Sequence, residues 1–112
     1  DMHDLTFEDN SFDLVVYRHS LEHVLIPYLA VMEMRRVSRR YLLVVVPVDT
    51  SHKLAFWPDH LYNLSRMGWE VMWLRMRLTT LQFVEGDFTE DYALQDKRWQ
   101  DLEWRYLLEK QP

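Results

Sequence analysis

The sequence predicts an α/β domain in which parallel strands are joined by a helix. Two short runs, 14–17 and 41–46, are apolar at successive positions, as expected for strands buried on both faces of a parallel sheet. Between them, Pro27 suits the first position of a helix. Four apolar residues around it recur at helical spacing: Ile26, Ala30, Met34 and Val37. Strand, helix and strand in this order predict a βαβ unit with a right-handed crossover.

The second half of the chain predicts a helix, two antiparallel strands and a last helix. We expect the first of these helices over 58–67, ended by Gly68. Residues 69–78 alternate as in a strand, and 79–84 would be its antiparallel partner. Acidic residues near its start and an apolar stripe favour a C-terminal helix over 89–110.

Length and composition exclude several kinds of partner. At 112 residues the chain is expected to form one domain with its own core. Its net charge of −5 argues against nonspecific binding of nucleic acid, which depends on Lys and Arg. The longest apolar run, 41–48, is much shorter than a membrane span, so no membrane partner is expected. The absence of Cys favours a reducing cytoplasm.

Four segments of the first 47 residues occur in an informative order: Asp1-Met2-His3-Asp4-Leu5-Thr6-Phe7, Ser11-Phe12-Asp13 before Leu14-Val15-Val16, Leu21-Glu22-His23, and Tyr41-Leu42-Leu43-Val44-Val45-Val46-Pro47. In this order and spacing they resemble the middle and later part of a class I S-adenosylmethionine (SAM)-dependent methyltransferase of the type 11 kind. The resemblance implies a partial Rossmann-like sheet with flanking helices. Its two N-terminal strands would lie side by side, with a C-terminal antiparallel pair on the far side.

The resemblance also implies SAM as the cofactor. Asp1 and Met2 hold the positions that lie beside the adenine ring, so Asp1 would accept a hydrogen bond from the adenine amino group. The alternative is that Asp1 is a frayed terminal residue. The two glycines, Gly68 and Gly86, cannot form the glycine-rich loop that would hold the methionine part of the cofactor. We therefore expect residues 1–112 to be a single truncated methyltransferase-like domain.

Two histidines follow the first predicted strand, at the edge where open α/β sheets bind ligands. The resemblance implies that His19 and His23 line the methyl-transfer pocket, where either could act as a general base. Alternatively, His23 packs the following helix against the sheet. Arg18, His52 and His60 would contribute to the substrate pocket. No His spacing typical of metal ligands occurs, so no metal site is expected.

Four arginines gather around the predicted end of the first helix: Arg35, Arg36, Arg39 and Arg40. The helix dipole favours cations near a helix C-terminus. We therefore expect a solvated helix end here rather than an anion site.

Two functions remain open. The first is a SAM-dependent methyltransferase fragment or truncated homologue, acting on a small molecule but not catalytic as an isolated chain. The second is a non-catalytic, oligomeric interaction or ligand-binding module derived from this fold. Because the strand over 14–17 lacks one neighbour, we expect a homodimer or other self-association. Edge pairing could mediate it, or the face of the C-terminal helix that carries Trp104 and Leu108.

Overall fold

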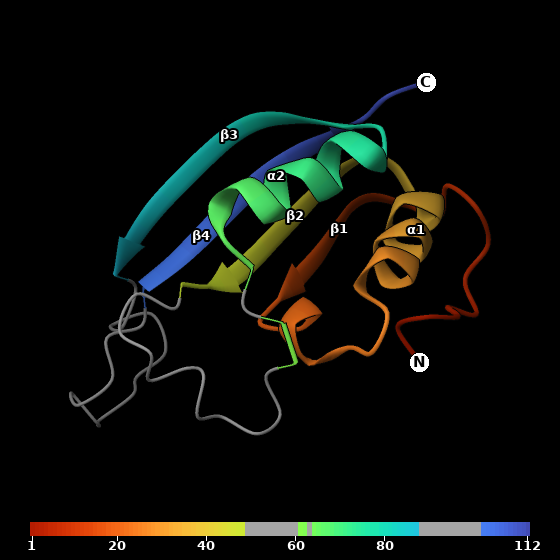
Figure 1. The fold of residues 1–112 in the computed structure, drawn as a ribbon. Helices are drawn as coiled ribbons and strands as arrows, with labels where there is room; N and C mark the ends of the chain where they lie inside the picture. Colours follow the sequence, from red (N-terminus) through yellow and green to blue (C-terminus); the bar gives the residue numbers. More distant parts are fainter. Residues whose placement is uncertain (49–60, 63, 88–101) are drawn as a thin grey trace.

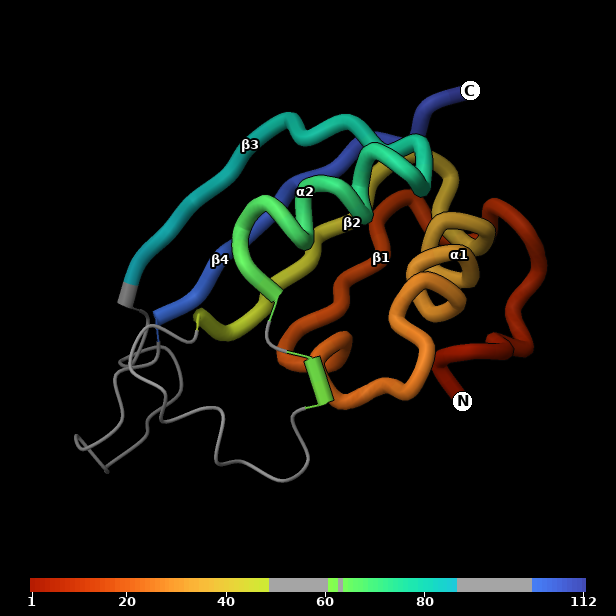
Figure 2. The backbone as a smooth tube through the Cα atoms, in the orientation of Figure 1, coloured from red at the N-terminus to blue at the C-terminus, as the bar shows by residue number. Residues whose placement is uncertain are grey.

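A computed structural model shows a four-stranded mixed sheet with two helices packed on one face (Figure 1 and Figure 2). It describes residues 1–48, 61–62, 64–87 and 102–112. The elements are β1 (Phe12–Arg18), a 3₁₀ turn η1 (Leu21–His23), α1 (Pro27–Val37), β2 (Ser38–Pro47), α2 (Arg66–Arg75), β3 (Leu78–Asp87) and β4 (Leu102–Lys110). Within the described residues, no helix is long and apolar enough to cross a membrane.

The strands lie in the order β1-β2-β4-β3, and β1, α1 and β2 form the predicted βαβ unit. β1 and β2 are parallel, with Tyr17 opposite Val44. Pro27 begins α1 as predicted, and Ile26 before it is exposed and provides no side-chain cap. The other apolar residues expected to face inward are buried: Ala30, Met34 and Val37. β2 follows α1 directly, without an intervening loop.

Residues 66–75 form a helix, so the strand predicted over 69–78 is wrong. Ser65 caps this helix, because its Oγ accepts a hydrogen bond from the Gly68 N–H at 3.1 Å. Gly68 therefore lies in the first turn of α2 and does not end a helix over 58–67, whose other residues lie partly outside the described ones. Three buried residues are spaced as on one helix face: Trp69, Met72 and Trp73. Apolar residues in this segment also alternate, which is why the pattern favoured a strand.

The C-terminal residues form a strand in the middle of the sheet, and the predicted C-terminal helix is wrong. β4 pairs antiparallel with β2 on one side and with β3 on the other. The strand predicted over 79–84 is confirmed as part of β3, but its partner is β4 rather than residues 69–78. Three alternate residues of β4 face the helices: Trp104, Tyr106 and Leu108. Residues 89–101 of the predicted helix lie outside the described residues.

Aromatic side chains fill the space between α2 and the sheet. The rings of Trp69 and Trp73 are stacked, with their centroids 5.9 Å apart. Trp73 meets Tyr106 of β4 at 5.5 Å, and Phe83 of β3 meets the same tyrosine at 5.0 Å. Burial raises the pKa of the Tyr106 hydroxyl. Tyr106 thus joins three elements in one aromatic cluster, which is where much of the high aromatic content of the chain is packed.

Glu33 and Arg36 of α1 hold the segment that precedes β1. Glu33 Oε2 accepts a hydrogen bond from the Leu5 N–H at 2.9 Å. Arg36 donates to the carbonyl oxygens of Leu5 and Phe7, at 3.0 and 2.9 Å. It also pairs with Asp9 at 2.7 Å and with Glu33 at 2.8 Å. The hydrogen bonds from Arg36 and from the Leu5 backbone lower the pKa of Glu33 to about 2.

β1 is an edge strand of the described sheet, where it pairs with β2 alone. Its Leu14 and Val16 side chains are 47% and 49% exposed. They lie on the face that the helices do not cover, because Val15 and Tyr17 point to the helices. The predicted association face on a C-terminal helix does not exist, since that segment is β4 and its Leu108 is fully buried.

The assignment of residues 66–75 to a helix makes a prediction about two neighbouring apolar side chains. Met72 is 1% exposed and Leu74 is 70% exposed, whereas a strand would place both on one face. Met72→Ala should lower the free energy of unfolding by about 2–5 kcal/mol. Leu74→Ala, the matched control, should change it by less than about 0.5 kcal/mol. Urea unfolding measures both, and similar losses in the two variants would contradict the helix.

The lowered pKa of Glu33 predicts an acid-sensitive contribution to stability. Because the folded pKa lies below the ordinary value of 4.5, ionised Glu33 stabilises the fold above that pH. The contribution is lost as the pH falls toward the folded value of about 2. Glu33→Gln should therefore lower the unfolding temperature at pH 7 and flatten its decline between pH 5 and 2. Glu8→Gln, at an exposed position of the same segment, should keep the wild-type profile.

Candidate functional site

A cavity of ≈ 470 Å³ lies at the C-terminal end of β1. Its walls come from the N-terminal segment, from the turn after β1 and from the approach to α1: Asp1, Met2, His3, His19, Ser20, His23, Val24 and Leu25. This is the edge at which open α/β sheets bind ligands. The structure therefore brings together four residues that the sequence analysis selected: Asp1, Met2, His19 and His23.

Asp1 and His3 form a hydrogen-bonded turn on one side of the cavity. Asp1 Oδ1 accepts hydrogen bonds from the His3 backbone N–H at 2.8 Å and from His3 Nδ1 at 3.0 Å. The Ile26 N–H donates to His3 Nε2 at 3.1 Å, so the proton of this ring lies on Nδ1. His3 thus ties the turn to the start of α1. These bonds hold Asp1 in the turn, and its Oδ2 has no hydrogen-bond partner among the described residues.

His19 lies beside a buried carboxylate. Its φ of 49° places it in the left-handed region, where its N–H donates to the Val45 carbonyl at 3.0 Å. Its Nε2 is 2.6 Å from Glu103 Oε1, and Arg105 Nε is 3.2 Å from Glu103 Oε2. Glu103 is fully buried, so these two partners offset the cost of removing a carboxylate from water. The contact holds the His19 ring against this carboxylate, at the wall of the cavity.

His23 lies in η1 beside a second buried carboxylate. Its Nε2 is 3.4 Å from Glu22 Oε1, and Glu22 is 1% exposed. The Glu22 carbonyl accepts hydrogen bonds from the N–H groups of Leu61 at 2.7 Å and Tyr62 at 3.2 Å, which hold the segment before α2 against η1. The His23 side chain is about one third exposed. It therefore packs against the turn and lines the cavity, so both roles considered for it are geometrically possible.

The other selected residues are not gathered here. Arg18 is exposed at the end of β1 and does not line this cavity. His52 and His60 lie outside the described residues. No group of three or more described His, Asp and Glu side chains could hold a metal ion.

Two residues of the site were missed by sequence reasoning. His3 directly follows Asp1 and Met2, and this proximity was a usable signal. Glu103 gave no signal, because the segment that carries it was assigned to a helix. Only the pairing of β4 with β2 places Glu103 near the end of β1.

Comparisons with known proteins bear on the fold of this chain. Residues 1–46 match a family model described as a methyltransferase domain. No curated protein matches the sequence.

Several solved structures share the fold. A SAM-dependent methyltransferase from Methanosarcina mazei matches 98% of this chain with a TM-score of 0.74 and 17% identity. The cyclase SpnF matches 98% with a TM-score of 0.73 and 16% identity. Magnesium protoporphyrin IX methyltransferase from Synechocystis, with S-adenosylhomocysteine (SAH) bound, matches 99% with a TM-score of 0.67 and 9% identity. The chain spans 64%, 53% and 49% of these proteins, respectively.

The shared fold extends over the whole sheet, whereas the family match covers β1, α1 and nearly all of β2. The order of parallel and antiparallel strands agrees with the arrangement that the resemblance implied. Together, the family match over residues 1–46 and the shared fold show a domain that resembles the class I SAM-dependent methyltransferases.

Proposed function

We propose that this chain forms the adenine side and the methyl-acceptor side of a SAM-dependent methyltransferase site, and that it does not transfer methyl groups as an isolated chain. The observation that carries the proposal is the cavity at the C-terminal end of β1, which joins Asp1 and Met2 to His19 and His23. The substrate class is a small molecule. The absence of Cys supports a cytoplasmic location.

The cavity suits the adenine end of the cofactor. Asp1 keeps one carboxylate oxygen able to accept a hydrogen bond from an exocyclic amine. Met2, Val24 and Leu25 provide apolar walls for a flat ring. The methionine end has no comparable support, because Gly68 lies in α2, Gly86 lies in β3, and neither lines the cavity. When bound, SAM supplies an electrophilic methyl group on a sulfonium centre.

His19 is placed to receive a proton from the methyl acceptor. Glu103 lies 2.6 Å from the ring at Nε2 and would stabilise the imidazolium formed when His19 takes up that proton. His23, on the same wall of the cavity, would orient the acceptor. Arg18, His52 and His60 remain proposed substrate contacts. In this scheme the protein's main contribution is to hold the acceptor in place, with proton transfer as a second one.

The adenine side can be tested by titrating the chain with SAH and following the Met2 methyl and His23 ring signals by NMR. We expect saturable shifts of these signals with a Kd of about 1 mM, since only part of the site is present. Asp1→Asn should weaken binding about 5-fold, because a hydrogen bond to a charged acceptor is stronger than one to a neutral acceptor by about 1 kcal/mol.

Asp4→Asn is the matched control, because Asp4 is exposed and does not line the cavity. It removes the same charge and should leave the affinity unchanged. Shifts that avoid Met2 and His23, or an equal loss in both variants, would contradict the proposed adenine side. Micromolar binding or methyl transfer by the isolated chain would contradict the second half of the proposal.

A second candidate function is an oligomeric interaction module, and the open strand β1 favours it. Parallel strands are normally covered on both faces, yet Leu14 and Val16 are about half exposed. The backbone of β1 also has an unpaired edge within the described sheet. A second copy of the chain could cover this strand and form a homodimer.

Sedimentation equilibrium of the purified chain tests this association. We expect a dimer in the wild type and a monomer in Val16→Lys, because a charge on the exposed face of β1 opposes burial. Met67→Lys places the same charge on α2, at a residue that is 74% exposed, and should remain dimeric. A monomeric wild type, or a dimeric Val16→Lys variant, would refute association through β1.

A further inference from the structure

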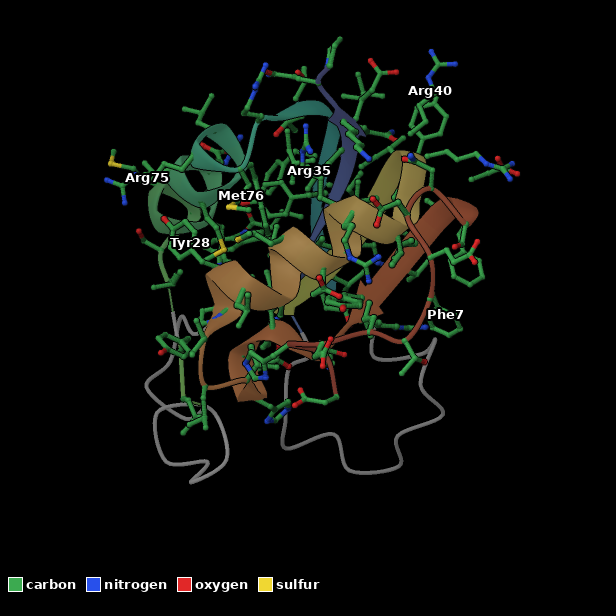
Figure 3. All side chains as sticks on the ribbon, turned by 90° about the vertical axis from the view of Figure 1, so that its right-hand side faces the viewer. Phe7, Tyr28, Arg35, Arg40, Arg75 and Met76 are labelled. Carbon is green, nitrogen blue, oxygen red and sulfur yellow. The ribbon has the colours of Figure 1, made fainter. Side chains whose placement is uncertain are left out.

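A second cavity, of ≈ 600 Å³, lies at the other end of the strands from the site described above, where α1 and α2 end. We call it the basic pocket, because five cationic side chains line it: Arg35, Arg36, Arg75, Arg77 and Lys110. Figure 3 looks onto this side of the molecule, with Arg35 and Met76 between the two helices and Arg75 and Tyr28 beside them. This local positive charge contrasts with the net charge of −5 of the chain.

The two carboxylates of the basic pocket are both engaged by Arg36. Glu33 Oε1 accepts from Arg36 Nε at 2.9 Å, and Glu33 Oε2 accepts from Arg36 Nη2 at 2.8 Å. Asp9 Oδ1 accepts from Arg36 Nη1 at 2.7 Å. Arg36 is therefore satisfied by the protein itself, in the structural role of holding the N-terminal segment. Among the described residues, the other four cations form no ion pair with these carboxylates, although the charge of Asp9 also acts on Lys110.

Within the described part of the chain, Arg35 and Lys110 donate hydrogen bonds to uncharged oxygens. Arg35 Nη2 donates to the Gln111 carbonyl at 2.7 Å, and its Nε is buried without a hydrogen-bond partner among the described residues. Lys110 Nζ donates to Asn10 Oδ1 and to the Ser38 carbonyl, both at 3.0 Å. Burial and the positive charge of Arg35 lower the pKa of Lys110. Two cations therefore lie close enough to interact, and neither forms an ion pair with a described carboxylate.

Arg75 and Arg77 complete the positive side of the pocket. Arg75 Nη1 donates to the Tyr28 hydroxyl at 3.3 Å, a long hydrogen bond to an uncharged group. Arg77 Nη2 donates to the Pro112 backbone oxygen at 2.6 Å, and its φ of 57° places it in the left-handed region at the end of α2. Met76 lies between these two arginines in the sequence and lines the pocket as well.

Helix dipoles explain only part of this accumulation of charge. Five cations and two carboxylates leave the basic pocket with a formal charge of +3. The C-terminal ends of α1 and α2 each carry roughly half a negative charge, so together they offset about one of these charges. About two positive charges remain, which matches the charge of a phosphate monoester near pH 7. A monocarboxylate would leave part of the positive charge uncompensated.

We propose that the basic pocket binds a phosphate monoester. Guanidinium groups form paired, charge-assisted hydrogen bonds to phosphate oxygens, and the buried Arg35 Nε is a donor that such a group would satisfy. Met32 and Met76 offer an apolar surface for the organic part of the ester. The earlier expectation of a merely solvated helix end holds for Arg39 and Arg40, which are 59% and 65% exposed, but not for Arg35.

The test is a titration with phenyl phosphate, followed through the Arg35 Nε–Hε signal and the backbone amides of Met76 and Gln111. Sodium chloride keeps the ionic strength constant, because exposed charges are screened by salt. We expect saturable shifts in the wild type, with a Kd of about 1 mM. Arg35→Gln should weaken binding by about 10-fold or more. Arg77→Gln should have the same effect, and it replaces Arg35→Gln in the test if that variant does not fold.

Arg39→Gln is the matched control, because it removes the same charge from an exposed residue that pairs with Asp13 and does not line the basic pocket. Its affinity should stay within about twofold of the wild type. Benzoate, which carries a carboxylate on the same ring, should bind at least about tenfold more weakly than phenyl phosphate. The absence of saturable shifts, equal binding of benzoate, an equal loss in Arg39→Gln, or shifts confined to Met2 and His23 would each overturn the proposal.

Discussion

The structure depends on one strand, β4, which pairs with β2 and β3 at the same time. β3 joins the parallel pair of β1 and β2 through β4 alone within the described sheet. The inward face of β4 places Tyr106 against Trp73 of α2. Its opposite face begins with Glu103, which reaches His19 at the end of β1. The aromatic core and the carboxylate beneath the candidate site are thus positioned by the same nine-residue strand.

The two ends of the strands carry different chemistry. At the C-terminal end of β1, histidines lie beside the buried carboxylates Glu22 and Glu103, and Asp1 offers a hydrogen-bond acceptor. At the opposite end, both helices end beside the basic pocket, where Arg35, Arg75 and Arg77 form no ion pair with a described side chain. The fold alone does not decide what either end does, because a cyclase and methyltransferases share it. The residues that line each cavity therefore decide what each end can bind.

The sequence predicts the first half of the fold well and the second half poorly. β1, α1 and β2 follow from strongly apolar strands and from Pro27, whose signals do not conflict. In α2, the spacing of Trp69, Met72 and Trp73 suits a helix while the same segment also alternates, so only the Ser65 cap distinguishes the two structures. In β4, tertiary pairing overrides a helical pattern of charges and apolar residues. The site follows the same division: Asp1, His19 and His23 could be selected from the sequence, whereas Glu103 depends on that pairing.

Amide hydrogen exchange followed by NMR tests whether β4 is an inner strand of one cooperative sheet. The amides of Tyr106 and Leu108 should exchange as slowly as those of Leu42 and Val44, because strands that pair on both sides open only with the whole sheet. Cross-strand contacts between Val44 and Tyr106 should appear in the same sample. Fast exchange in β4, or helical contacts between residues three apart over 102–110, would contradict the account.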